Sequence, residues 1–246
     1  MSHLEPKAFL SETLLQRAAA LPFSRLARLR FQGRDYFVKM AEIHDNMRLR
    51  LFKGDPASAL AREAAMLRSF AARGAAVARI IAADERRLIL ADHGTPVEKA
   101  IRSGDVSDAL LRQIGSALAD LHARGLAHGR PVLRDICHDG SAITFLDLEA
   151  GAKLDATDHD KARDLMVLIY SMMVTTSANR HMARQVIEGY RQAGTEAVWQ
   201  KTRRRSRNLW WLELLALPGV WVHRRRGKRR SEMIAIGATR ALIAAI

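Results

Sequence analysis

Lys39 and Glu63 are the first residues in this sequence whose types and positions point to chemistry. Lys39 lies in the apolar run of residues 36–40, where its ammonium either reaches water at a strand edge or is buried against a carboxylate and an anion. Glu63 follows Leu60 by three residues and precedes Leu67 by four, so it falls on the apolar stripe of a helix. A carboxylate that faces a core needs a cation, and we predict an ion pair between Glu63 and Lys39. The alternative is a Glu63 side chain that tilts to the helix edge and is solvated.

Asp135 and Asp147 are candidates for holding a metal ion. Asp135 ends a loop, residues 128–135, that follows an amphipathic helix, and Asp147 ends an apolar strand expected over residues 143–146. Paired carboxylates beside phosphates are the usual way in which proteins hold Mg²⁺. If the loop and the strand are neighbours, the two acids flank one magnesium site. Otherwise each acid is an ordinary turn residue or cap.

The elements that must position these residues begin with a set of strands and one helix. We expect strands at residues 27–31, 36–40, 77–82 and 87–90, a tight turn at residues 32–35, and a helix that opens at Asp55 and Pro56 and ends before Gly74. The pattern breaks at residues 92–94, and we place a lobe boundary there.

The second set of elements is mainly helical. Ser107 is expected to cap a helix that ends at Gly125, one short strand precedes Asp147, and another helix begins at Asp164. Strands first and helices later predict an α+β fold in two lobes. The predicted N-terminal lobe is residues 1–92 and the predicted C-terminal helical lobe is residues 93–246.

The order of these features resembles the protein-kinase-like fold. It comprises a lysine on a strand, a glutamate on a helix, a His-Gly loop after a helix, and an aspartate after a strand. The sequences of these motifs are similar to those of the bacterial lipopolysaccharide-core kinases, the Kdo/heptose kinase family with its InaA-like members. There the loop reads like HGDxxxxN and the metal motif like DFE or DFG. The resemblance covers residues 25–173.

The resemblance implies ATP and Mg²⁺ as cofactors and assigns a role to each matching position. Lys39 would hold the α- and β-phosphates and Glu63 would orient it. Asp147 and Asp135 would bind the metal ion, with Asp135 at a position that is normally asparagine. Residues 91–94 would form the adenine hinge, with Ala91 and His93 at the nucleotide, and Asp164 would brace the catalytic loop.

Two departures from the family pattern affect catalysis. Arg130 stands two residues after His128, where the family has its catalytic aspartate, and arginine cannot accept a proton. Residues 23–27, before Lys39, contain no glycine to cradle phosphates. Arg130 could instead steady a phosphorylated acceptor or the transferring group, and Asp135 could act as the base. The candidate catalytic residues are therefore Arg130, Asp135 and Asp147.

A basic tail, residues 201–230, carries most of the positive charge of the chain. It holds 11 basic residues and one acid, a net charge of +10 out of +14 for the whole chain. Three of the four tryptophans, Trp210, Trp211 and Trp221, lie between its basic clusters. This composition suits an anionic membrane surface. It also suits stacking on single-stranded nucleic acid, or an ordinary solvated face with packed tryptophans.

Composition indicates a cytoplasmic protein, and the basic tail adds the expectation of a peripheral position at the inner membrane. Cys137 is the single cysteine, which excludes an internal disulfide and fits a reducing compartment. The longest apolar stretch, residues 209–222, has 14 residues, whereas a membrane span needs about 20. Three hypotheses follow: a phosphotransferase acting on a sugar or lipid-linked sugar, a nucleotide-binding pseudokinase without turnover, and a nucleic-acid-binding protein.

Overall fold

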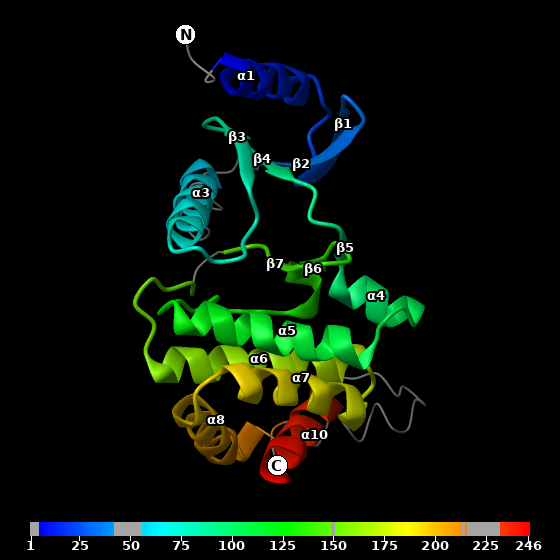
Figure 1. Cartoon of the computed structure of the whole chain (residues 1–246), viewed down its shortest axis with the longest axis vertical. Coiled ribbons are helices and arrows are strands. Elements are labelled where there is room, and N and C mark those ends of the chain that lie inside the picture. Colours follow the sequence, from blue (N-terminus) through cyan, green and yellow to red (C-terminus); the bar gives the residue numbers. More distant parts are fainter. Residues whose placement is uncertain (1–4, 42–55, 149–150, 213–214, 216–231) are drawn as a thin grey trace. The chain divides into compact units, whose positions relative to one another are not determined.

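The computed structural model describes residues 5–41, 56–148, 151–212, 215 and 232–246, with the order of elements shown in Figure 1. The chain divides into two compact units. The N-terminal unit comprises residues 1–73, 77–93 and 147–149, and the C-terminal unit comprises residues 74–76, 94–146 and 150–246. The sheet of four strands in the first unit and the helices of the second confirm the predicted α+β class.

The N-terminal unit is built on an antiparallel sheet with strand order β1-β2-β4-β3. Its strands are β1 (Leu26–Phe31), β2 (Arg34–Met40), β3 (Ile80–Ala83) and β4 (Arg87–Ala91). The turn between β1 and β2 is only two residues long, because Gln32 and Gly33 both take the left-handed backbone, with φ of 49° and 73°. The predicted turn over residues 32–35 is therefore too long, and β3 begins later than residue 77.

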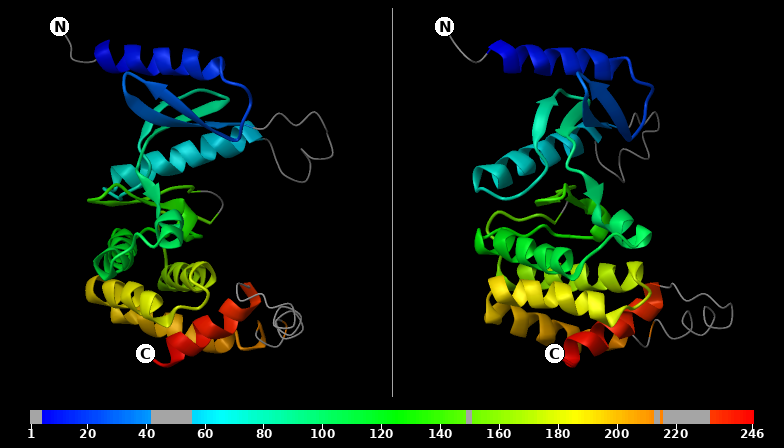
Figure 2. Two further views of the ribbon diagram at one scale, coloured as in Figure 1. Left: turned by 90° about the vertical axis from the view of Figure 1, so that its right-hand side faces the viewer. Right: turned by 45° about the vertical axis from the view of Figure 1, so that its right-hand side comes forward.

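A helix packs on each face of this sheet (Figure 2). Helix α1 (Glu5–Ala19), which we did not predict, buries Leu14 and Ala18 against Leu29, Val38 and Ile89. Helix α3 (Pro56–Ala72) contacts β3 and β4 and buries its predicted apolar stripe. Because side chains alternate along a strand, Lys39 lies on the face opposite the α1 core, and it is paired across the sheet with Leu26 and Leu88.

The C-terminal unit combines a small antiparallel sheet with a group of helices. Strands β5 (Thr95–Pro96), β6 (Ile136–His138) and β7 (Ile143–Phe145) pair in that order, so the lone strand that we predicted before Asp147 is the edge strand β7, which pairs with β6. The helices are α4 (Val97–Ser103), α5 (Asp108–Ala123), α6 (Asp158–Thr175), α7 (Arg180–Ala193), α8 (Glu196–Asn208) and α10 (Glu232–Ala244), and a 3₁₀ turn, η1, spans Leu133–Asp135.

Helices α5 and α7 approach closely because glycines lie at their contact. A Cβ atom on Gly115 would lie 2.0 Å from the Val186 carbonyl oxygen, and one on Gly189 would lie 2.0 Å from that of Arg112. The predicted cap of α5 is confirmed, since the Ser107 hydroxyl accepts a hydrogen bond from the Leu110 N–H.

Helix α6 begins earlier than we predicted. Its first residue is Asp158 rather than Asp164, and a capping box of Thr157 and Asp160 fixes that start. Asp164 therefore lies in the second turn of the helix, where its side chain is buried. Among the residues that the structure describes, no helix has both the length and the apolar character needed to cross a membrane.

Candidate active-site residues

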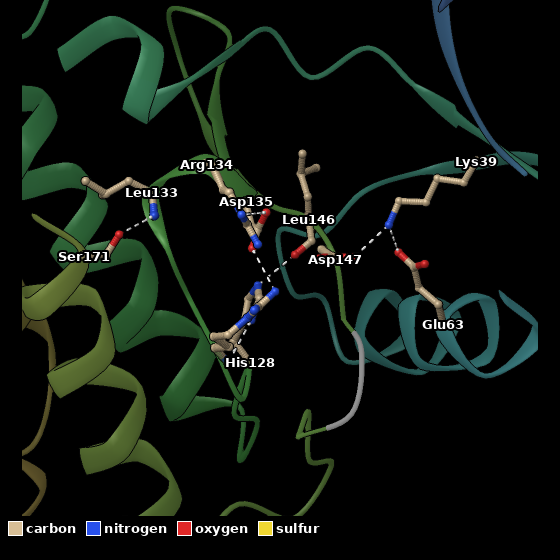
Figure 3. A network of polar contacts seen from close by, with 10 residues as sticks. Lys39, Glu63, His128, Leu133, Arg134, Asp135, Leu146, Asp147 and Ser171 are labelled. Carbon is tan, nitrogen blue, oxygen red and sulfur yellow. Dashed lines mark hydrogen bonds and ion pairs between the residues drawn. The ribbon is translucent and has the colours of Figure 1, made fainter. Parts of the chain in front are cut away.

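The ammonium of Lys39 lies between two carboxylates (Figure 3). Its Nζ atom donates to Glu63 Oε1 at 2.5 Å and to Asp147 Oδ1 at 2.9 Å, which confirms the predicted ion pair with Glu63. The Glu63 side chain is 7% exposed, whereas those of Lys39 and Asp147 are 21% and 20% exposed. The contact with Asp147 joins residues 108 positions apart, and nothing in the spacing predicts it.

The three charges leave this group with a net charge of −1. Burial by itself would lower the pKa of Lys39, but the attraction of Glu63 and Asp147 and the hydrogen bonds to both outweigh it and raise that pKa. Lys39 is thus a permanent cation. Such a group, with one carboxylate partly exposed, fits a hard cation that brings its own anionic ligands.

Magnesium bound with a nucleotide has this character, because it usually takes one or two carboxylates and completes its coordination with phosphate oxygens and water. Within the described part of the chain, no cluster of three or more His, Cys, Asp or Glu side chains could hold a metal ion by itself. The partly exposed carboxylate of Asp147 is a ligand type that Mg²⁺ accepts together with a nucleotide.

Two arginines share the sheet face of Lys39. The β1–β2 register pairs Leu26 with Lys39 and places Arg28 and Arg30 two and four residues farther along the same face. Arg28 donates to Asp35 at 2.5 Å, which raises the pKa of Arg28 and lowers that of Asp35. The alternation of charged residues along β1 was the available signal, but only the register showed which face they occupy.

The loop after α5 is held by a buried aspartate. Asp164 accepts hydrogen bonds from the His128 N–H at 2.6 Å and the Gly129 N–H at 2.9 Å. The His128 ring bonds to the Leu146 carbonyl at 2.8 Å through Nε2. Gly129 has a φ of 90°, and a Cβ atom there would lie 2.3 Å from the carbonyl carbon of Gly151, so only glycine fits. This geometry agrees with the bracing role that the family resemblance implied for Asp164.

A histidine that we did not single out extends this network. His122 on α5 lies with Nε2 3.5 Å from Asp164 Oδ2, and its Nδ1 bonds to the Tyr190 hydroxyl at 2.7 Å. Burial lowers the pKa of His122, and the neighbouring Asp164 only partly opposes this effect. His122 lies at the end of α5, and no local pattern distinguishes it from a core histidine.

In the C-terminal unit Asp135 lies near two arginines, Arg130 and Arg134, the second of which is labelled in Figure 3. Arg130 Nη2 is 3.9 Å from Asp135 Oδ2, and Arg134 Nε is 3.5 Å from Asp135 Oδ1. The Asp135 side chain is 13% exposed, whereas the arginines are 54% and 61% exposed. The structure thus brings together two of the predicted catalytic residues, Arg130 and Asp135, and adds Arg134.

A model of the phosphotransferase enzyme family, APH, matches residues 29–224 of the chain. The chain belongs to this family. An uncharacterized protein of Haemophilus influenzae is 24% identical to it over 198 residues, which are 79% of this chain and 81% of that relative.

In this phosphotransferase-family chain the predicted adenine hinge lies at the end of β4. The Ala91 N–H donates to the Arg79 carbonyl at 3.0 Å, and the His93 ring accepts from the Arg79 N–H at 2.9 Å. Ala91 and His93 therefore also fix the backbone of Arg79, which directly precedes β3. A role for Ala91 and His93 at the nucleotide stays a prediction.

Part of the basic tail lies outside the described residues, including Trp221 and the cations of residues 224–230. In the described part, Trp210 and Trp211 are 57% and 45% exposed. They follow α8, which exposes the cations Lys201, Arg204 and Arg207. The exposure of these two side chains is compatible with each of the alternatives for the tail, and its partner stays a prediction.

Proposed function

We propose that this chain transfers phosphate from ATP, with Mg²⁺, to a sugar or lipid-linked sugar of the lipopolysaccharide-core type. The observation that carries the proposal is the ammonium of Lys39 between Glu63 and Asp147, at 2.5 and 2.9 Å. Phosphoryl transfer depends mainly on positioning and on charge stabilisation, and this group supplies both. Bound ATP with Mg²⁺ provides the transferable phosphoryl group and the cation that offsets its charge.

Each side chain of this group has a distinct part in the proposal. Lys39 donates to phosphate oxygens, and the buried Glu63 holds the ammonium in position. Asp147 binds the metal ion, and the metal role that the resemblance implied for Asp135 stays a prediction. Arg28 and Arg30 add positive charge on the Lys39 face of the sheet, where the sequence lacks a glycine-rich loop. Ala91 and His93 contact the base.

Nucleotide binding is the direct test, because a ligand that binds only the folded protein raises its melting temperature. We expect millimolar ATP with Mg²⁺ to raise the melting temperature of the parent. The shift should be small in Lys39→Ala and Asp147→Ala, and unchanged in the exposed controls Lys99→Ala and Asp105→Ala. An unchanged melting temperature of the parent would reject the proposal.

A second candidate function is a nucleotide-binding pseudokinase. The observation that favours it is Arg130, which cannot accept the acceptor proton that an aspartate takes in the family pattern. Loss of a general base typically costs about 10²–10⁴-fold in rate, so slow turnover is compatible with the enzyme. Incubation of the parent with ATP, Mg²⁺ and a panel of sugars, lipid-linked sugars and proteins separates the two. Clear nucleotide binding with no ADP or phosphorylated product would favour the pseudokinase.

The place of action proposed for the enzyme is the anionic cytoplasmic face of the inner membrane. Exposed Trp210 and Trp211 beside the cations of α8 support it, since tryptophan favours the interface and cations favour anionic lipid. Vesicle sedimentation should increase with anionic lipid content and decrease with salt. The double variant Trp210→Ala, Trp211→Ala should bind about tenfold more weakly.

A matched control for this membrane test is Phe9→Ala, which removes an exposed aromatic side chain from the N-terminal unit. Equal binding of the parent to neutral and anionic vesicles would contradict the membrane proposal. Preference for single-stranded DNA over vesicles would instead support the nucleic-acid hypothesis.

A further inference from the structure

Polar groups from three helices and one loop form a chain of contacts inside the C-terminal unit. The Tyr190 hydroxyl on α7 lies 2.7 Å from Nδ1 of His122 on α5, and the other ring nitrogen, Nε2, lies 3.5 Å from Oδ2 of Asp164 on α6. Asp164 in turn accepts from the N–H groups of His128 and Gly129. The side chains of His122 and Asp164 are 4% and 1% exposed, so bulk water does not reach them.

The contacts of the His122 ring assign the position of its proton. The carboxylate of Asp164 can only accept, whereas the Tyr190 hydroxyl can donate. Burial raises the pKa of Tyr190, so this hydroxyl keeps its proton. Only a ring with its proton on Nε2 gives every group a complementary neighbour, because Tyr190 then donates to Nδ1 and the Nε2–H points to Asp164. The neutral ring therefore links α7 to α6 with its donor toward Asp164.

The contact between His122 and Asp164 is longer than a hydrogen bond. Its length is 3.5 Å, whereas N–H···O hydrogen bonds span roughly 2.7–3.2 Å. Within the described part of the chain, Nε2 of His122 is buried and has no hydrogen-bond partner. The same carboxylate oxygen, Oδ2, accepts from the His128 N–H at 2.6 Å. This oxygen therefore lies between two donors, of which the backbone N–H is bound at full strength and the ring N–H is not.

We propose that His122 is a positioning residue for the loop of residues 128–135, which stays anchored to Asp164 while the ring is neutral and loosens when the ring is protonated. A second proton, taken from solvent, adds to Nδ1 and makes the ring an imidazolium. Nε2 is then drawn to Oδ2 of Asp164 and competes with the His128 N–H for that oxygen. On the other side Nδ1 becomes a donor, so the Tyr190 hydroxyl turns to accept and loses the acceptor of its own proton.

The groups that face His122 set the pH at which the loop loosens. Burial has the largest effect and lowers the pKa of His122 from its usual 6.5. On α6, Asp164 acts to raise this pKa and Lys161 acts to lower it. On α7, Tyr190 stays neutral, since the charges of Asp164 and Asp158 add to the effect of burial on its pKa. The loop is therefore anchored at neutral pH and loosens only as the pH falls below 6.5.

The first measurement uses the parent chain alone, so it does not depend on the folding of any variant. Nitrogen-15 magnetic resonance of the histidine rings at pH 7.5 should show the proton of His122 on Nε2. A proton on Nδ1 would overturn the inference, because the ring would then turn a lone pair toward the carboxylate of Asp164.

The second measurement follows the backbone amide signals of His128 and Gly129 between pH 7.5 and 5.5. We expect both signals to shift with the midpoint of the His122 ring. Exchange of the His128 N–H with solvent, corrected for the intrinsic effect of pH, should accelerate about tenfold below that midpoint. His122→Gln keeps a donor toward Asp164 and cannot be protonated, so the shift should disappear. The matched control His181→Gln, which removes an exposed histidine, should retain it.

His128 has a ring of its own, so the source of the shift decides the outcome. A shift that persists in folded His122→Gln, or loop amides of the parent that do not follow the His122 ring, would overturn the inference. The consequence for turnover rests on the proposed phosphotransferase function, and phosphate transfer by the parent should decline with the same midpoint. Transfer that is constant through the midpoint would reject the positioning role. A loop that titrates with His122 in a chain without phosphate transfer would retain that role and reject the phosphotransferase proposal.

Discussion

In the N-terminal unit one cation, Lys39, lies between two carboxylates, whereas in the C-terminal unit one carboxylate, Asp135, lies between two guanidinium groups. The first group is closely bonded, at 2.5 and 2.9 Å, and its glutamate is almost fully buried. The second is looser, at 3.5 and 3.9 Å, and its arginines are exposed.

This difference indicates which ligand each group can receive. A net negative group with a buried anchor fits a metal ion that arrives with phosphates, and it keeps the residue types of the kinase-like pattern. The second group has exposed guanidinium donors, and its sequence departs from that pattern at Arg130. The N-terminal group thus keeps the residue types of the kinase-like pattern, whereas the C-terminal group does not.

The largest effect should come from removing the anchor of the loop of residues 128–135. Asp164→Ala leaves the buried N–H groups of His128 and Gly129 without their acceptor, and each such loss costs about 1–3 kcal/mol. We expect the free energy of unfolding, measured by urea denaturation, to fall by about 2–5 kcal/mol. The surface variant Asp120→Ala, which removes an exposed pair with Arg124, should change it by less than about 1 kcal/mol. Equal effects of the two variants would show that Asp164 does not anchor the loop.

The next effect concerns the positive charge of Arg130. Replacing Arg130 by aspartate restores the residue that the family motif has at this position. Replacing it by alanine removes the cation without adding an anion. In a working enzyme that uses the arginine, both variants should lower turnover several-fold to a hundredfold, or about 1–3 kcal/mol. Phosphate transfer from ATP to an acceptor identified with the parent measures this. A gain of activity in Arg130→Asp from an inactive parent would instead identify a degenerate pseudokinase.

An effect of similar size is expected for the pair in the N-terminal unit, measured by a double-mutant cycle. Lys39→Met, Glu63→Gln and the double variant should yield a coupling energy of about 1–3 kcal/mol, because the pair is close and Glu63 is buried. The exposed pair of Arg102 and Glu98, also at 2.5 Å, should couple by less than about 1 kcal/mol. Similar coupling energies in both cycles would show that the burial of Glu63 does not strengthen its pair with Lys39.

The smallest effect is a pH dependence that arises at His122. Burial lowers its pKa below the usual 6.5, so the unfolded chain takes up this proton first as the pH falls. The contribution of His122 to the free energy of unfolding is therefore complete above pH 6.5. This contribution is lost as the pH decreases below that value, by up to about 1.4 kcal/mol per pH unit. His122→Gln should flatten the fall in unfolding free energy between pH 7.5 and 5.5. The exposed His181→Gln is the control, and an identical slope in parent and His122→Gln would contradict the prediction.

Local sequence patterns predicted those features that depend on neighbouring residues along the chain. The apolar stripe of α3 placed Glu63 toward the core, and Ser107 marked the start of α5. The start of α6 was predicted too late because the capping box of Thr157 and Asp160 was overlooked. This signal was present in the sequence, since a cap and its N3 partner are only three residues apart.

Contacts between distant residues could not be predicted in this way. The Lys39–Asp147 bond, the Asp164 anchor and the Leu133–Ser171 bond join residues 108, 35 or 36, and 38 positions apart. The spacing of residues reports which side of an element is buried but does not identify the partner across the core. Ser171, for example, lies within α6, and only the structure shows that its hydroxyl holds the loop through the Leu133 N–H.

The sequence by itself determined the α+β class, the pairing of Lys39 with Glu63, and the replacement of the usual catalytic aspartate by Arg130. These follow from residue identity and from periodicity, which are properties of the chain. The tertiary structure decided that Lys39 also bonds Asp147 and that Asp135 lies between Arg130 and Arg134. Charges act through space, so their sum at a site emerges only when the fold brings distant residues within a few ångströms of one another.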